Sequence, residues 1–375
     1  MGVTAVICEY NPFHSGHEKQ IRLIKRARPD DAVICLMSRF FCQRGEAAVF
    51  APAVRARCAL AAGADLVLGL SASDVLCDAG EFAENGVIAA DAIGADTLCF
   101  GSESGDVGEI VSKAEEQMSG GFLSKVDAAM KSDATRSRAS VVSELTGSTG
   151  SNDILGVEYV KAIKKHGFGI KAEAIKRDGG YLSGGSAFDI RNRIFSGGEV
   201  AGVPGYAADA YRKEMSEGRT FRLENAARAV LTAFRSADAD SLGRFRMMNR
   251  EIAGTLIKAA SSSESLEEML CRALRKRYSA SRLRRAVVSA MLRIERGDAK
   301  GPAFLTLLGL SSGYADRFSA MKKECGIPIV SRLSEARAAD PGALETENRA
   351  AGFYALCGGD IMTGRLFITE KPAVL

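Results

Sequence analysis

The sequence lacks an apolar segment long enough to cross a membrane. Its longest apolar stretch, Ala59–Leu70, is interrupted by Asp65 and by glycines, and it falls short of the roughly 20 residues that a membrane helix needs. The first residues also lack the basic region, apolar core and cleavage site of a secretory signal. Val3–Cys8 is better explained as a buried strand. We therefore expect a cytoplasmic protein with no membrane contact.

No two of the nine cysteines have the Cys-x-x-Cys spacing that is typical of zinc sites. Several lie in apolar runs, where a free thiol behaves as a small hydrophobic group. Buried, reduced thiols in a cytosolic protein explain this pattern better than disulfides or zinc ligands do, and no metal ligand is predicted. The cysteines are Cys8, Cys35, Cys42, Cys58, Cys77, Cys99, Cys271, Cys325 and Cys357.

A strong net charge is also absent, since the chain carries only +4, which is too little to indicate nucleic-acid binding by itself. The arginines are nevertheless concentrated in one region where apolar residues recur at helical spacing. A negatively charged partner can dock on such a surface, but a run of arginines on a helix is often only a solvated face. The region contains Arg272, Arg275, Lys276, Arg277, Arg282, Arg284, Arg285, Arg293 and Arg296.

The length and the pattern along the chain predict an α/β protein of more than one part. A chain of 375 residues exceeds what one compact core usually holds. Short β-branched runs alternate with alanine-rich stretches over the first hundred residues, as in βαβ units around a parallel sheet. We predict a nucleotide-binding domain over 1–205, a helical, arginine-rich region over 206–300 and a small C-terminal region over 301–375.

The predicted elements place polar residues where an α/β sheet binds its ligands, beyond the carboxyl ends of the strands. Asn11–His17, Ser38–Glu46 and Gly101–Glu103 each follow a predicted strand. The predicted strands are Val3–Cys8, Ala32–Met37, Leu66–Leu70, Thr97–Phe100 and Lys171–Lys176. The predicted helices are Gly16–Ala27, Val54–Ala62, Phe82–Ile93, Ile154–Lys165 and Ser186–Ile194.

Histidine is scarce, yet two of the three histidines flank Ser15-Gly16 between a predicted strand and a predicted helix. A helix N-terminus offers unpaired N–H groups to a phosphate, and glycine lets the phosphate approach the backbone. His14 and His17 can donate hydrogen bonds to a triphosphate and stabilise charge on the α-phosphate as pyrophosphate leaves. A motif this short also recurs by chance, with a histidine merely capping the helix. The strand-turn-helix context favours His14 and His17 as catalytic residues.

Several motifs in order resemble the bacterial tRNA(Met) cytidine acetate ligase family, within the superfamily of HxGH nucleotidyltransferases and class I aminoacyl-tRNA synthetases. The resemblance implies a Rossmann-like nucleotidyltransferase sheet with a helical C-terminal region. The matching segments are Val6–His17, Gln43–Glu46, Gly63–Val67, Cys99–Glu103, Asn152–Gly156, Ser186-x-x-x-Ile190-Arg191, Lys276–Tyr278 and Ser281–Arg285.

Members of that family activate acetate with ATP as acetyl-adenylate and transfer the acetyl group to N4 of the wobble cytidine of elongator tRNA(Met). The resemblance therefore implies ATP with Mg²⁺, acetate and tRNA as ligands. The implied ATP-binding residues are Ile7, Cys8, Glu9, Tyr10, Asn11, Pro12, Phe13, Ser15, Gly16, Gln20, Gly101, Asn152, Arg177, Ser186 and Arg191. The implied tRNA contacts are Arg275, Lys276, Arg277, Arg282, Arg284 and Arg285.

Simpler explanations remain open for the residues outside the histidine motif. Gly101 can be an ordinary turn glycine, Asn152 an N-cap, Arg177 a surface residue and Ser186 only a helix cap. Arg44 can pair with Glu46 rather than act in the site.

The sequence departs from the family at three places expected near the acceptor side of the site. Ala51-Pro52 replaces an Asp-Lys pair, Arg39-Phe40 replaces Gly-Asn, and Tyr181-Leu182-Ser183 replaces Tyr-His-Asp.

Because of these departures, two other functions stay open. One is an adenylyltransferase of a small phosphorylated metabolite, which leaves the arginines unexplained. The other is a diverged, non-catalytic nucleotide- or RNA-binding protein, which the intact histidines oppose and Ala51-Pro52 favours.

Overall fold

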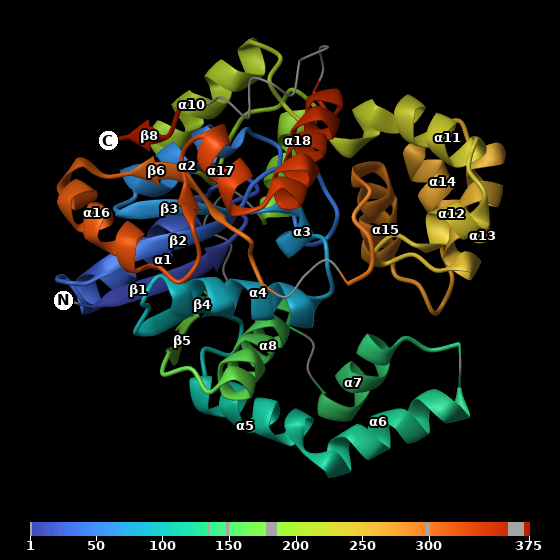
Figure 1. Ribbon diagram of the computed structural model, residues 1–375, viewed down its shortest axis with the longest axis horizontal. Helices are drawn as coiled ribbons and strands as arrows, with labels where there is room; N and C mark the ends of the chain where they lie inside the picture. Colours follow the sequence, from blue (N-terminus) through green and yellow to red (C-terminus); the bar gives the residue numbers. More distant parts are fainter. Residues whose placement is uncertain (1, 134, 148–149, 178–185, 298–300, 359–370) are drawn as a thin grey trace.

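The computed structural model describes residues 2–133, 135–147, 150–177, 186–297, 301–358 and 371–375. Within these ranges, one eight-stranded sheet has the order β5-β4-β1-β2-β3-β6-β7, with β8 also paired to β6 (Figure 1). The strands are β1 Val3–Cys8, β2 Ala32–Ser38, β3 Leu66–Leu70, β4 Thr97–Ser102, β5 Lys171–Lys176, β6 Leu305–Leu310, β7 Ile329–Val330 and β8 Ala373–Val374.

The five strands from the first half of the chain are parallel to one another, which confirms the predicted α/β fold. The sheet then continues with β6, which runs antiparallel to β3 and pairs Thr306 with Gly69. Its residues come from the apolar run Phe304–Leu310, which the sequence alone did not identify as a strand. The last eighty residues thus extend the sheet on its β3 side.

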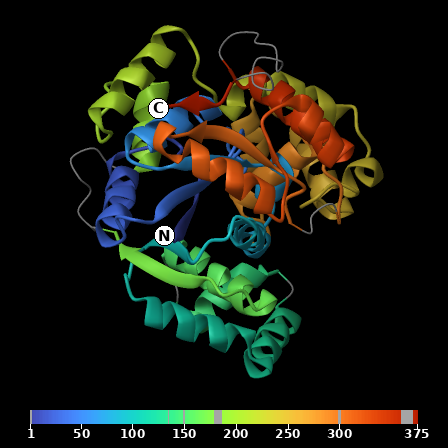
Figure 2. The ribbon, with the colours of Figure 1, turned by 60° about the vertical axis from the view of Figure 1, so that its left-hand side comes forward.

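Helices cover both faces of the sheet (Figures 1 and 2), because successive strand residues point to opposite sides. Val33, Cys35 and Met37 of β2 pack with α1 and α2, whereas Ile34 and Leu36 pack with α4 and α8. The four helices are α1 Ser15–Ala27, α2 Pro52–Ala61, α4 Ala79–Ala92 and α8 Ser151–His166. Burial on both faces explains why these strands are continuous apolar runs.

The strand order reverses direction between β1 and β4. The chain proceeds from β1 to β2 and β3 on one side, and then returns to β4 on the other side of β1. The β1–β4 ladder joins only Thr4 to Thr97 and Ala5 to Leu98, although both strands continue beyond these pairs. A ligand of an open α/β sheet binds at such a switch point, beyond the carboxyl ends of the strands.

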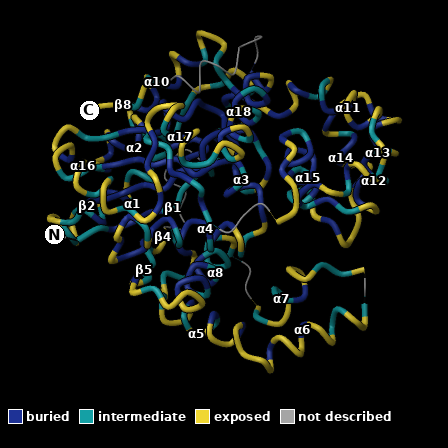
Figure 3. Tube along the Cα trace, in the orientation of Figure 1, coloured by how far each residue is buried: buried dark blue, intermediate teal, exposed yellow. Residues whose placement is uncertain are grey.

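Two groups of helices lie away from the faces of the sheet. Helices α11 to α15 gather beside the sheet, and α5 to α7 lie under β5 and α8, with α6 exposed along most of its length (Figures 1 and 3). No described helix has the length and apolar content needed to span a membrane. The bounds are α3 Ala72–Val75, α5 Val107–Met118, α6 Gly120–Ser132, α7 Arg138–Thr146, α9 Ala187–Phe195, α10 Gly205–Ser216, α11 Ala227–Arg235, α12 Ala239–Gly243, α13 Arg250–Ser261, α14 Leu266–Ala273, α15 Ala280–Leu292, α16 Ala315–Glu324, α17 Leu333–Ala339 and α18 Pro341–Leu356.

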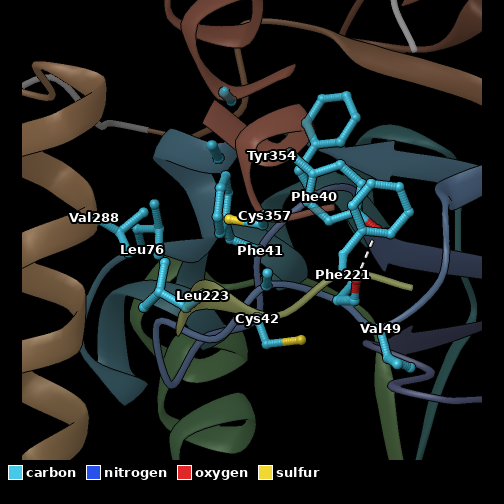
Figure 4. Close-up of a cluster of buried hydrophobic side chains, with 14 of the residues drawn as sticks. Phe40, Phe41, Cys42, Val49, Leu76, Phe221, Leu223, Val288, Tyr354 and Cys357 are labelled. Carbon is cyan, nitrogen blue, oxygen red and sulfur yellow. Dashed lines mark hydrogen bonds between the residues drawn. The ribbon is translucent and has the colours of Figure 1, made fainter. Parts of the chain in front are cut away.

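One buried cluster joins the segment after β2 to the C-terminal helices (Figure 4). Phe40 lies 5.4 Å from Tyr354 of α18 between ring centroids, and Phe221 stacks on Tyr354 at 4.1 Å. The Tyr354 hydroxyl donates to Ala48 O at 2.6 Å, and Phe221 N donates to Val49 O at 3.0 Å. The loop beyond β2 is therefore fixed by residues some 170 to 310 positions later in the chain.

Candidate nucleotide site

The segment between β1 and α1 is held in a tight, specific shape. Tyr10 has φ +48, and the Asn11–Pro12 peptide is cis. A left-handed conformation costs a non-glycine residue on the order of 1 kcal/mol or more, and packing of the buried tyrosine offsets it. The Tyr10 ring lies 4.9 Å from Phe13 and 4.8 Å from His17, and its hydroxyl lies 3.3 Å from Cys35 Sγ. The turn places both histidines at the start of α1.

The two histidines form a reciprocal cap on α1. His14 Nδ1 accepts from Gly16 N at 3.1 Å, and His17 Nδ1 accepts from His14 N at 3.3 Å. Their rings stack with centroids 3.7 Å apart. A neutral imidazole carries one proton, and an accepting Nδ1 leaves that proton on Nε2. Both side chains can therefore cap the helix and still offer an Nε2–H donor, so the capping role does not exclude the catalytic one.

Burial keeps both imidazoles uncharged at neutral pH. It lowers the pKa of His14 to about 4, with a further contribution from Arg177. Burial likewise holds the pKa of His17 well below its usual range, assisted by His14 and Arg177. Two neutral donors beside a helix N-terminus can bind a triphosphate without giving up a proton in the process.

Gly16 is required by the position of His14. A Cβ on Gly16 would lie 2.9 Å from His14 Cε1, closer than real Cβ contacts allow. Ser15 N donates to Gly202 O at 3.1 Å, and Gln20 Nε2 donates to Cys99 O at 3.4 Å. The latter bond joins α1 to β4 where β4 no longer pairs with β1.

Gly101 and Arg177 lie on the other side of the switch point. Arg177 N donates to Ser102 O at 2.8 Å, which continues the β4–β5 ladder. A Cβ on Gly101 would lie 3.5 Å from Arg177 Cγ and Cδ, an ordinary contact. The positive charge of Arg177 also lowers the pKa of both histidines, after burial as the main cause. The structure thus brings together four of the residues predicted from sequence.

Asn152 does not cap α8, so that simpler explanation is wrong. The helix begins at Ser151 with Gly150 at the N-cap. Asn152 Nδ2 instead donates to Glu103 Oε1 at 2.6 Å, and Asp153 N donates to Glu103 Oε2 at 2.9 Å. Asp153 in turn accepts from Glu103 N at 3.0 Å. This exchange of hydrogen bonds fixes α8 to the end of β4, and no motif in the sequence indicates it.

Ser186 caps the N-terminus of α9, and Arg191 lies within this helix. Ser186 Oγ accepts from Asp189 N at 3.2 Å, and Asp189 Oδ2 accepts from Ser186 N at 2.8 Å. The predicted capping role of Ser186 is therefore present. Arg191 Nη1 donates to Asn11 O at 2.7 Å, and Arg191 Nη2 pairs with Glu46 at 3.1 Å. Arg191 thus contacts residues 9–17, which we call the nucleotide segment, and Glu46 pairs with Arg191.

Arg55 is a site-organising residue that sequence reasoning missed. Its side chain is fully buried. Nε donates to Phe50 O at 3.0 Å, and Nη1 donates to Glu9 O at 2.6 Å and to Ser38 O at 2.9 Å. Nη2 donates to Arg39 O. The sequence shows only an arginine inside an alanine-rich helix, which reveals neither its burial nor the carbonyls that it binds.

The departure at Arg39-Phe40 is accommodated by a residue from α18. Arg39 Nη1 pairs with Glu347 Oε2 at 2.8 Å, and both side chains are buried. Glu347 Oε1 also accepts from Ala72 N at 2.6 Å.

Ala51 and Pro52 form the N-cap and first residue of α2, a position that suits proline. The departure at Tyr181–Ser183 lies outside the described residues.

The predicted tRNA-binding residues fall into two groups. Arg275, Lys276 and Arg277 are exposed on a turn between α14 and α15. Arg282 is partly buried, with its guanidinium 5.1 Å from the centroid of the Tyr278 ring. Arg284 is partly buried and Arg285 is 8% exposed; both contact the loop after β2. A pocket between α13 and α14, which Arg275 also lines, adds the cations Arg250, Lys258 and Arg272 together with the carboxylate of Glu251.

Carboxylates do not gather into a metal site in the described part of the chain. Among those residues, no group of three or more His, Cys, Asp or Glu side chains is placed to hold a metal ion.

A family model described as HIGH Nucleotidyl Transferase matches residues 1–364. The chain belongs to the HIGH nucleotidyl transferase family. It is 31% identical over 360 residues to a tRNA(Met) cytidine acetate ligase of Fervidobacterium nodosum, covering 89% of this chain and 84% of the relative. It is 30% identical to one of Listeria monocytogenes, covering 95% of each. The predicted resemblance to these ligases is confirmed.

The fold matches a solved structure of the same kind along its whole length. The crystal structure of Thermotoga maritima TmcAL bound with alpha-thio ATP superimposes with a TM-score of 0.89 at 28% identity, covering 100% of both chains. The apo form of TmcAL superimposes with a TM-score of 0.91. The predicted enzyme on a HIGH-type nucleotidyltransferase fold is therefore confirmed.

Proposed function

We propose that this member of the HIGH nucleotidyl transferase family is an ATP-dependent ligase that acetylates N4 of the wobble cytidine of elongator tRNA(Met). The observation that carries the proposal is the pair of neutral imidazoles, His14 and His17, at the start of α1 beside the β1–β4 switch point. The names of relatives that align with most of the chain support the choice of acetate and tRNA.

In the first step, a carboxylate oxygen of acetate attacks the α-phosphorus of ATP. The bond from the α-phosphorus to the bridging oxygen breaks, and pyrophosphate leaves with the electron pair. The Nε2–H groups of His14 and His17 donate to the phosphate oxygens as negative charge builds up on them. Arg177 supplies a fixed positive charge next to the histidines. Acetyl-adenylate is the product.

In the second step, N4 of the cytidine attacks the acetyl carbonyl carbon. AMP leaves with the electron pair of the broken carbon–oxygen bond, and N4 loses one proton to water or to the leaving phosphate. Mg²⁺ would neutralise the triphosphate in the first step. We assign no protein ligand to it.

The ATP pocket that we propose extends from Ile7 to Gln20 and includes Gly101, Asn152, Arg177, Ser186 and Arg191. The side chain of Asn152 is hydrogen-bonded to Glu103. The side chain of Arg191 is bound to Glu46 and to Asn11 O. A nucleotide that contacts them must therefore share or replace these partners. We further propose that 1–205 binds ATP, 206–300 binds tRNA and 301–375 completes the sheet, and that the reaction takes place in the cytoplasm.

The exposed turn Arg275–Arg277 and the basic pocket between α13 and α14 form the proposed tRNA surface. Contacts of arginine with phosphates give affinity that falls with salt and discriminates little between sequences. A tRNA substrate therefore explains the concentration of arginine in this region, whereas a small phosphorylated metabolite does not.

Acetate-dependent exchange of labelled pyrophosphate into ATP tests the first step. We expect exchange that requires acetate and falls by at least about a hundredfold in His17→Ala. Exchange that needs a phosphorylated metabolite instead would favour an adenylyltransferase. ATP binding without any exchange would favour a non-catalytic nucleotide- or RNA-binding protein.

A further inference from the structure

The loop of residues 42–46, between β2 and α2, lies directly against the first turns of α15. Cys42 N donates to Glu46 O, and Gly45 N donates to Cys42 O, both at 2.8 Å. Gly45 has φ +77, and a Cβ there would lie 2.6 Å from Arg285 N. Only glycine allows so close an approach of the two backbones at this conformation.

Two consecutive arginines of α15 hold this loop. Arg285 is 8% exposed, and its Nη1 donates to Gln43 O at 3.2 Å. Arg284 Nε donates to Arg44 O at 3.3 Å, and Arg284 Nη2 lies 3.6 Å from Glu46 Oε1. Both guanidinium groups are therefore directed at protein acceptors.

The same loop holds the nucleotide segment from its other side. Gln43 N donates to Glu9 Oε1 at 2.6 Å. Glu46 Oε2 pairs with Arg191 at 3.1 Å, and Arg191 donates to Asn11 O at 2.7 Å. Glu46 is thus the carboxylate shared by an arginine of α15 and an arginine that contacts the segment leading to His14. It pairs with these two residues rather than with Arg44, the partner considered from sequence.

We infer that Glu46, Arg284 and Arg285 are positioning residues for the nucleotide segment, acting through the 42–46 loop, and that the two arginines do not contact tRNA phosphates. The inference rests on the proposed function, because it assigns a role within that site. It divides the basic region in two: α15 supports the ATP site, while the exposed turn at Arg275–Arg277 binds RNA. On that turn Arg275 Nη1 donates to Leu274 O, and Arg277 Nη1 lies 3.7 Å from Glu251 Oε2, but both side chains stay exposed.

The test compares Glu46→Gln and Arg284→Gln with Arg277→Gln, which removes an exposed charge from the proposed tRNA surface. We would measure the Kd for ATP, the rate of pyrophosphate exchange, and the slope of log affinity for tRNA against log salt concentration. Glu46→Gln and Arg284→Gln should weaken ATP binding or exchange by about tenfold, since a small displacement of positioning groups is costly. They should leave the salt slope unchanged. Arg277→Gln should lower the slope by about one and leave ATP binding unchanged.

Arg285→Lys is a further variant, and thermal denaturation identifies any variant that fails to fold. Glu46 and Arg284 are only partly buried, so we expect their variants to fold. These two variants decide the test if Arg285→Lys does not fold. A reduced salt slope in Arg284→Gln with normal ATP binding would overturn the inference, as would ATP binding and exchange that are unchanged in both Glu46→Gln and Arg284→Gln. The ATP Kd needs neither acetate nor tRNA, so the inference remains testable even if wild-type protein shows no acetate-dependent exchange.

Discussion

His14 and His17 stack with ring centroids 3.7 Å apart, and each accepts a backbone N–H through Nδ1. The same two side chains therefore cap the N-terminus of α1 and keep their Nε2–H groups available to a ligand. Protonation of either ring would replace an accepting Nδ1 with a donor and break this arrangement.

The first prediction concerns the dependence of stability on pH. The folded-state pKa of His14, about 4, lies below the usual value of 6.5, so the unfolded chain binds the proton first as the pH falls. The free energy of unfolding should fall between about pH 6.5 and pH 4, by up to about 1.4 kcal/mol per pH unit for this residue, and should be unaffected above pH 6.5. Urea denaturation of wild type and His14→Gln across this range measures the difference. Identical pH profiles would contradict the assignment.

The second prediction concerns Gly16. In Gly16→Ala, the new Cβ would lie 2.9 Å from His14 Cε1, so the imidazole must move away from its position. We expect pyrophosphate exchange to fall by about tenfold or more, with little change in melting temperature. Gly352→Ala in α18, where a Cβ meets nothing within 4 Å, is the matched control. Equal exchange in the two variants would show that the position of His14 is unimportant.

The third prediction concerns Arg55, which donates to four carbonyl groups while fully buried. Arg55→Met leaves these acceptors without their partner, and we expect it to lower the free energy of unfolding by about 3 kcal/mol or more. Arg57→Met, at an exposed position of the same helix, should change it by less than about 0.5 kcal/mol. Urea denaturation of both variants measures this contrast, which vanishes if Arg55 only fills space.

The fourth prediction concerns the Arg39–Glu347 pair. Arg39→Met leaves Glu347 buried without its guanidinium and should cost about 3–5 kcal/mol at neutral pH. Burial raises the pKa of Glu347, and Arg39 opposes that rise. In the variant, this pKa rises further, so the folded state binds the proton more readily and stability should recover as the pH falls. The double variant Arg39→Met with Glu347→Gln should recover most of the loss at every pH. Denaturation at pH 5 and pH 8 distinguishes this from a pH-independent loss of packing.

The local features of the fold and site could be predicted because they depend on short segments. The sequence identified β1, β3 and β5 with their observed bounds, and the histidine motif at the start of α1. It did not reveal β6, because a short apolar run does not distinguish a strand from a buried helix. Nor did it reveal that Glu347 would meet Arg39 or that Arg284 would meet Glu46, since these pairs join residues hundreds of positions apart. Arginine spacing alone cannot separate a guanidinium that binds protein carbonyls from one that faces solvent.

The most direct test of the proposed function is the product of the complete reaction. Purified protein is incubated with ATP, Mg²⁺, isotopically labelled acetate and unmodified elongator tRNA(Met), and the digested tRNA is examined by mass spectrometry. We predict labelled N4-acetylcytidine at the wobble position, dependent on ATP and absent with His17→Ala. Wobble cytidine that stays unmodified, in protein shown to bind both ATP and tRNA, would contradict the proposal.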